Sequence, residues 1–145
     1  MTAEEVIAAL DLAPHPEGGW YRQTWAAEAS PGERPAGTCI YFLLKVGERS
    51  HWHRVEDADE IWHFYAGAPV LLSVAETSGG PAGDIRLGPD PLGASMTPQA
   101  VVPRGWWQSA RSTGAWSLVG CTVSPGFTFD SFVLAPPGFD IPAAP

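Results

Sequence analysis

Frequent glycine and proline residues constrain the fold of this chain more than any other feature. The 145 residues include 16 Gly and 15 Pro, and no segment after residue 11 keeps the apolar period of a helix for long. The segments between them are short and rich in β-branched and aromatic side chains, as strands are. The pattern predicts about ten strands that close into an all-β sandwich or barrel. The expected strands are 19–25, 37–45, 50–55, 60–66, 69–76, 84–88, 99–103, 106–111, 115–123 and 128–135.

The first residues predict one short helix. Thr2 and Glu5 have the spacing of a capping box, in which each side chain bonds the other residue's backbone N–H. Val6, Ile7 and Leu10 would form the apolar face of this helix. No repeat and no composition change marks a second domain, so residues 1–145 are expected to form a single domain, with the Pro-rich end lying along its body.

The charge distribution argues against two classes of partner. The net charge is −8, and the eight Lys and Arg residues are scattered singly along the chain, so we expect no nucleic acid and no anionic membrane as partner. The first ten residues are acidic where a signal peptide is basic. Cys39 and Cys121 lie in apolar stretches, which is typical of free thiols in a reducing compartment. These features predict a cytoplasmic protein.

The stretch SHWHRVEDADEIWHFYAG, residues 50–67, carries three histidines and four carboxylates among apolar and aromatic residues. Side chains alternate between the two faces of a strand. Residues 50–55 would therefore place His51, His53 and Val55 on one face.

The same alternation divides residues 60–66. Glu60, Trp62 and Phe64 would share the face that points into a barrel, and His63 would lie on the outer face with two apolar neighbours. An apolar outer face on a strand usually lies beneath a partner subunit or another sheet. We therefore expect a homodimer.

Residues 47–67 resemble the first motif of the cupin superfamily, whose barrels are of the RmlC-like jelly-roll type. That motif aligns its two glycines with Gly47 and Gly67, its first His with His53 and its Glu with Glu60. Its second His falls on Val55. The resemblance implies a double-stranded β-helix, the cupin jelly-roll barrel, preceded by the short N-terminal helix.

The second cupin motif resembles the segment VPRGWWQSARS. Pro103 and Gly105 match it, while its His falls on Gln108 and its Asn on Ser112. The resemblance therefore keeps two of the four usual metal ligands of a cupin, His53 and Glu60.

A narrower resemblance covers most of the chain. HPEGGWYRQTW, residues 50–67, VPRGWWQSA and VSPGFTFDSF are similar, in this order, to the signatures of a small cupin family of unknown function. The Glu that follows the Tyr of the opening motif in that family is Gln23 here. The resemblance implies a dimer and supplies no reaction.

Two readings of the site remain open. In the first, His53, Glu60 and either His51 or Gln108 bind a divalent metal weakly, because an amide oxygen is a poor ligand for soft metals and Val55 cannot ligate. In the second, no cofactor is needed, and His53 and Glu60 form an acid/base pair at one wall of an aromatic pocket. The other expected ligand-binding residues are His51, Gln108, Tyr21, Trp62, Phe64, Trp106 and, as secondary candidates, His15 and Glu17.

In all readings the pocket binds a small molecule, and its aromatic walls allow a sugar-like ligand. The two readings of the site leave three functions open. The first is isomerase- or epimerase-like proton transfer without a metal, the second is a metal-dependent oxygenase or lyase with a reduced ligand set, and the third is ligand binding without catalysis.

Overall fold

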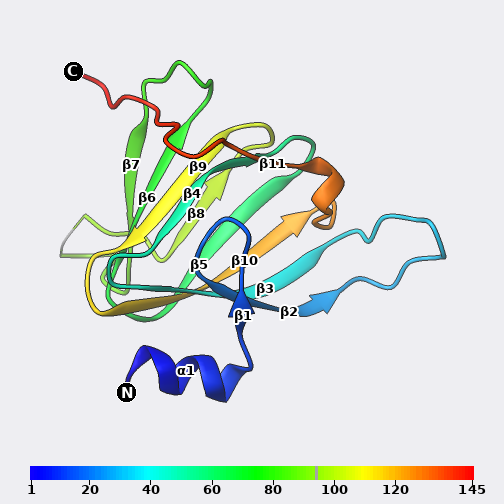
Figure 1. Ribbon diagram of the computed structural model, residues 1–145, viewed down its shortest axis with the longest axis horizontal. Helices are drawn as coiled ribbons and strands as arrows, with labels where there is room; N and C mark the ends of the chain where they lie inside the picture. Colours follow the sequence, from blue (N-terminus) through cyan, green and yellow to red (C-terminus); the bar gives the residue numbers. More distant parts are fainter. Residues whose placement is uncertain (94) are drawn as a thin grey trace.

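A computed structural model describes residues 1–93 and 95–145 of the chain. One helix precedes a series of antiparallel strands, and a single 3₁₀ turn lies near the end (Figure 1). The elements are α1 (Ala3–Leu10), β1 (Ala13–Pro14), β2 (Trp20–Ala26), β3 (Thr38–Lys45), β4 (Arg49–Val55), β5 (Asp59–Gly67), β6 (Val70–Ala75), β7 (Gly83–Leu87), β8 (Gln99–Val102), β9 (Trp107–Ser112), β10 (Trp116–Ser124), η1 (Phe129–Ser131) and β11 (Phe132–Leu134).

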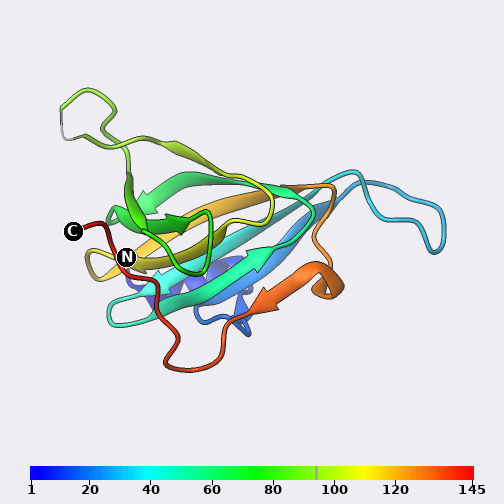
Figure 2. The same cartoon turned by 90° about the horizontal axis from the view of Figure 1, so that it is seen from above.

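The strands form two sheets that face each other (Figures 1 and 2). The six-stranded sheet has the order β1-β2-β3-β10-β5-β8, and the five-stranded sheet has the order β11-β4-β9-β6-β7. Consecutive strands β4 and β5 lie in different sheets, which is the crossing that a jelly roll requires. The predicted all-β fold with one N-terminal helix is confirmed.

The N-terminal helix begins at the predicted capping box. The Thr2 hydroxyl accepts a hydrogen bond from the Glu5 backbone N–H at 3.2 Å, and the Glu5 carboxylate accepts one from the Thr2 N–H at 2.9 Å. The helix buries Ala3 and Val6 against Leu43 of β3, which is fully buried. It therefore covers one part of the outer surface of the six-stranded sheet.

The hydrophobic core fills only one end of the space between the sheets. On β3 the core includes Phe42 and Leu44, on β5 it includes Trp62, and on β10 it includes Val119. Further along the same three strands, the inward side chains line a cavity instead. The sandwich is thus packed at one end and hollow at the other.

The C-terminal residues lie across the outer face of the five-stranded sheet, as expected. Trp52 Nε1 donates to the Asp140 carboxylate at 2.8 Å, and the rings of Trp107 and Phe139 lie 5.3 Å apart. A parallel bridge joins Ala82 to Ala143. The tail therefore buries a tryptophan cluster that the sheet would otherwise expose.

Two local details differ from the sequence prediction. Residues 128–135 were expected to form one strand, but Phe129–Ser131 form a 3₁₀ turn and only Phe132–Leu134 continue as β11. The turn forms because Ser131 N–H bonds back to the Thr128 carbonyl at 3.2 Å. The short strand β1 was not expected. Both cysteines are free, and no helix in the described residues is long and apolar enough to cross a membrane.

Candidate functional site

A cavity of about 270 Å³ lies between the sheets at the end that the core leaves open. Its ionisable side chains come from the 15–19 turn, from β4 and from β5, while β2, β3, β10 and the segment 127–132 supply most of the remaining wall. The lining residues are His15, Glu17, Tyr21, Gln23, Thr38, Ile40, His53, Val55, Glu60, Cys121, Val123, Phe127, Phe129 and Phe132.

The turn His15–Gly19 brings a carboxylate to β4. Gly18 has a positive φ of +106°, and a Cβ there would lie 2.2 Å from the Arg49 carbonyl oxygen, so only glycine lets the turn approach this closely. His51 N–H of β4 donates to the Glu17 carbonyl at 2.8 Å. This local contact places the Glu17 side chain against the inner face of β4.

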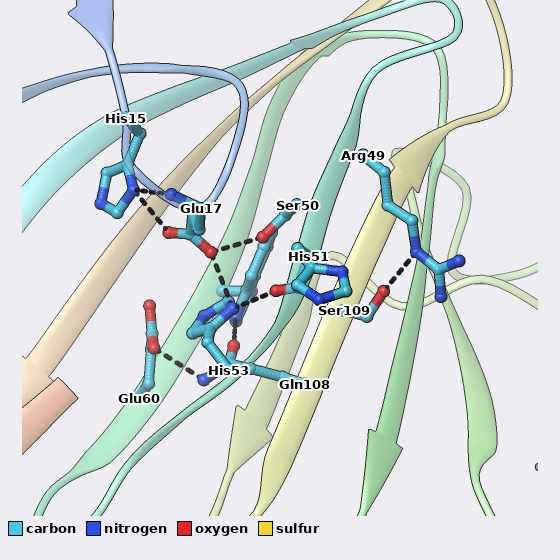
Figure 3. A network of polar contacts seen from close by, with 10 residues as sticks. His15, Glu17, Arg49, Ser50, His51, His53, Glu60, Gln108 and Ser109 are labelled. Carbon is cyan, nitrogen blue, oxygen red and sulfur yellow. Dashed lines mark hydrogen bonds and ion pairs between the residues drawn. The ribbon is translucent and has the colours of Figure 1, made fainter. Parts of the chain in front are cut away.

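The Glu17 carboxylate is the centre of a buried polar network (Figure 3). Its Oε2 lies 2.8 Å from His53 Nδ1 and also accepts a hydrogen bond from the Ser50 hydroxyl. Its Oε1 lies 3.3 Å from His15 Nδ1. Burial raises the pKa of Glu17, but the charge of His53 and hydrogen bonds from His53 and Ser50 outweigh it, so the pKa falls below its ordinary value.

His53 is a buried cation. Its side chain is 3% exposed, and Nδ1 lies 2.7 Å from the His51 carbonyl oxygen as well as near Glu17. Burial lowers the pKa of His53, but Glu17, Glu60 and the His51 carbonyl together raise it to about 9. At neutral pH the ring is therefore protonated, and Nε2 is the nitrogen left to meet a ligand.

His15 is the neutral histidine of the pair. Burial lowers its pKa, and the opposing effect of Glu17 is smaller. The Glu17 backbone N–H donates to His15 Nδ1 at 3.1 Å, which assigns the proton to Nε2. The Tyr21 ring lies 4.4 Å from the His15 ring and fixes its plane. The site thus contains one charged and one neutral imidazole.

Glu60 lies on the six-stranded sheet, opposite His53 of β4 in the five-stranded sheet (Figure 3). Its Oε1 accepts a hydrogen bond from Gln108 Nε2 at 2.9 Å, and Gln108 Oε1 accepts one from Trp62 Nε1 at 2.7 Å. Burial raises the pKa of Glu60, and the opposing charge of His53 does not cancel this. Cys121 lies beside Glu60, and burial raises the pKa of its thiol well above the ordinary value.

Three phenylalanines form the apolar wall on the segment 127–132. The Phe127 ring lies 5.0 Å from that of Phe129 and 5.6 Å from that of Phe132, each nearly edge to face. Phe132 also lies 5.4 Å from the His53 ring. Sequence reasoning missed these three residues, although the PGFTFDSF motif contains all of them.

The structure brings six of the ten proposed site residues together at one end of the barrel. His53, Glu60, Tyr21, His15 and Glu17 line the cavity, and Gln108 lies directly behind Glu60. The secondary candidates His15 and Glu17 are as central as the primary ones.

His51 lies elsewhere. Its Nε2 is 3.0 Å from the Pro136 carbonyl oxygen in the C-terminal tail, so it does not share the face of His53. The reason is a bulge, because the pairing of β4 with β9 changes register between Ser50 and His53. Ser50 takes the inward position that strand alternation assigned to His51.

Three expected wall residues also lie outside the cavity lining. Trp62 is a fully buried core residue, and Phe64 and Trp106 pack against the same core. The face prediction for Trp62 and Phe64 is correct, but both side chains lie at the packed end of β5, while Glu60 lies at the hollow end.

A cupin metal does not fit the donor atoms present. Val55 lines the cavity at the second His position, and both ends of the Gln108 amide already have partners in Glu60 and Trp62. His53 carries a proton that a metal would have to displace. Among residues 1–93 and 95–145, no group of three or more His, Cys, Asp and Glu side chains is arranged to hold a metal ion.

The double-stranded β-helix with a cavity at one end defines a cupin. Residues 4–135 match the family described as Cupin superfamily (DUF985), so the chain belongs to this family. This confirms the resemblance seen in the motifs. A search of curated proteins finds no match.

Solved structures show the same fold. A protein from Shewanella oneidensis is 41% identical, with a TM-score of 0.85 over 93% of this chain and 85% of its own. A hypothetical protein from Leishmania major is 31% identical, with a TM-score of 0.81 over 93% of this chain and 88% of its own. A variant of oxalate decarboxylase from Bacillus subtilis is 14% identical, with a TM-score of 0.61 over 81% of this chain and 28% of its own, and this likeness concerns the fold alone.

Proposed function

We propose that the cavity binds a small molecule and moves a proton on it by acid/base chemistry without a metal, as isomerases and epimerases do. The observation that carries this proposal is the pairing of buried His53 with Glu17 in a cavity that Glu60 also lines. Two titratable groups with displaced pKa values in one cavity are typical of catalytic sites. The contacts of each residue support a distinct role.

His53 serves as the hydrogen-bond donor to the ligand. Glu17 and the His51 carbonyl fix the ring through Nδ1, which leaves the Nε2–H directed at the ligand. A fixed cationic donor in a water-poor site stabilises negative charge that develops on a carbonyl oxygen. Glu17 is therefore a positioning residue that acts through His53.

Glu60 serves as the base. Gln108 holds its Oε1, and the side chain lines the cavity. Its raised pKa brings its proton affinity closer to that of a substrate carbon acid. In the proposed step, Glu60 takes the proton from the carbon next to a carbonyl while His53 hydrogen-bonds the resulting enolate oxygen. Glu60 then returns the proton on the same face to that carbon or, where that carbon bears a hydroxyl, to the former carbonyl carbon while the hydroxyl proton passes to the enolate oxygen.

Deuterium uptake tests this function. The protein is incubated in D₂O with a chelator and a panel of hydroxy-ketones, aldoses and lactones, and proton NMR follows the signal of the carbon next to the carbonyl. We expect exchange on at least one compound, with a loss of roughly 100-fold or more for His53→Gln and for Glu60→Gln.

His63→Gln is the matched control, because His63 lies on the outer face of β5 and contacts Thr122 rather than the cavity. His53→Ala should also weaken binding of any compound that exchanges, even with the chelator present. If compounds bind in the cavity but wild type and His53→Gln exchange none of them, the cavity is a binding site without catalysis and the proposal fails.

A further inference from the structure

Lysine and arginine side chains are excluded from the cavity. Of the eight Lys and Arg residues, none lines it. Arg34 contacts the segment that carries the phenylalanines, but its guanidinium donates to the Gly126 carbonyl at 2.7 Å and to Asp57 at 2.6 Å. The cavity therefore has no arginine or lysine with which to bind a phosphate or a carboxylate.

The His53 cation on the cavity floor already has its counter-charge. Glu17 and His53 form a close pair at 2.8 Å, with the Ser50 hydroxyl on the same carboxylate oxygen. An incoming anion would therefore find this cation already paired, and it would meet the carboxylate of Glu60, which also lines the cavity. Burying an anion without a counter-charge is costly.

The cavity buries its ionisable groups and exposes part of its aromatic wall. His53 is 2% exposed, Glu60 8% and Glu17 9%, whereas Phe129 is 54% exposed. The ionisable groups thus lie deep, while Phe129 lies toward solvent. A ligand that contacts both has oxygens at its leading end and carbon surface behind them.

We infer that the cavity selects an uncharged, ring-sized molecule whose hydroxyl or carbonyl oxygens enter first, and that it rejects phosphorylated and carboxylated analogues. The size follows from the volume of about 270 Å³, close to the lower end of the usual range of roughly 300–1,000 Å³. The inference rests on the proposed function and specifies its substrate class.

Pairs of compounds that differ in charge test the inference. The pairs are glucuronate and its methyl ester, and cyclohexanecarboxylate and its methyl ester. In each pair the neutral member is the larger, so selection for small size alone would favour the charged member. Backbone amide NMR shifts of Val55 and Phe127 report binding inside the cavity. We expect the neutral member to bind at least tenfold more tightly in one or more pairs and the charged member to be preferred in none.

Two variants test which lining residues set this preference and whether an added cation reverses it. Phe129→Ala should weaken binding of the neutral compounds severalfold, while Val101→Ala, which truncates another exposed apolar residue, should leave it unchanged. Gln23→Lys places a cation in the lining and should shift the ester-to-acid ratio at least tenfold toward the acid. Thr24→Lys, on the neighbouring residue outside the lining, should not.

The inference is overturned if an acid binds as tightly as its neutral partner, or if no neutral compound shifts the cavity amides up to its solubility limit. Neutral preference without deuterium uptake on any panel compound would leave the substrate class standing and remove the proposed proton transfer. Deuterium uptake on a charged compound that binds more tightly than its neutral partner would leave the proton transfer standing and remove the proposed substrate class.

Discussion

The inner and outer surfaces of the barrel each carry a histidine beside aromatic residues, and the two histidines have different surroundings. His53 is buried between Glu17 and the His51 carbonyl. His63 lies on the outer face of β5, where its ring nitrogens contact the Thr122 hydroxyl at 3.1 Å and the Gln99 amide at 3.3 Å. Only the first has a carboxylate partner away from water.

The difference shows that the surroundings of a histidine, and not its residue type alone, decide whether its ring is held as a buried cation. Burial by itself would drive His53 to its neutral form, and only the carboxylates beside it hold it as a cation. His63 has neutral partners, so a polar amide could replace it without leaving a buried charge unpaired. Four predictions test or sharpen this contrast.

The largest effect is expected for Glu17→Gln. It leaves the buried His53 cation without its closest counter-charge, a change that typically costs about 3–5 kcal/mol of unfolding free energy. His63→Gln is the matched control and should change stability by about 0.5 kcal/mol or less. Urea unfolding at pH 7 measures both. Equal, small losses for the two variants would contradict the contrast.

The second prediction concerns pH. The pKa of His53 in the folded state is about 9, above its ordinary value of 6.5. The protonated ring therefore contributes its full stabilisation to the folded state at pH values below 6.5. As pH rises through about 9 this stabilisation is lost, by roughly 3 kcal/mol. Unfolding free energies between pH 6 and 10 measure the loss, which His53→Gln should abolish. A wild-type curve that stays level through this range would refute the charged state of His53.

The third prediction concerns the outer face. We expect a homodimer that covers Tyr65 and Val101, whose side chains are 48% and 56% exposed in the single chain. Tyr65→Arg should weaken the dimer by about 2 kcal/mol, or roughly 30-fold. Light scattering over a dilution series measures this, with Val46→Arg on the exposed β3–β4 turn as control. A wild-type monomer at micromolar concentration would contradict the prediction.

The smallest effect is expected for Val55→His. It restores a nitrogen donor at the second motif position, on the cavity wall, and should raise the affinity for Zn²⁺ or Ni²⁺ by about tenfold, or about 1.4 kcal/mol. Calorimetric titration measures it, with Val46→His as control. Wild-type protein that keeps one equivalent of metal on His53 and Glu60 after dialysis against a chelator would show that the donor set is already sufficient.

Strand alternation predicted the faces of β5 correctly and failed at β4. Nothing interrupts the inward sequence Glu60, Trp62 and Phe64, whereas the bulge after Ser50 moves His51 out of the barrel. A bulge depends on how two strands distant in the sequence pair, so the residues of β4 alone do not reveal it. Most strands were predicted within a few residues, because glycine and proline mark their ends.

The depth of a residue along a strand was the other property that sequence could not supply. Alternation identifies the inward face, but it does not say where the core ends and the cavity begins. Trp62 and Glu60 share a face, yet only Glu60 lines the cavity. The apolar wall was missed for a related reason, since Phe129 lies in a 3₁₀ turn that bends the expected strand.

The C-terminal tail has a consequence for solubility and self-association. It lies over Trp52 and Trp107, and next to β7 it pairs only through Ala82 and Ala143. Strand β7 is bridged on its outer side by Thr97 at Leu87, and the unpaired remainder of such an edge strand is a template on which further chains can add. Proline has no backbone N–H, so Pro142 and Pro145, on either side of that bridge, limit the ladder that an incoming strand could extend. Truncation at residue 135 would expose two tryptophans and this edge together, and the shortened chain should aggregate where the full chain remains in solution.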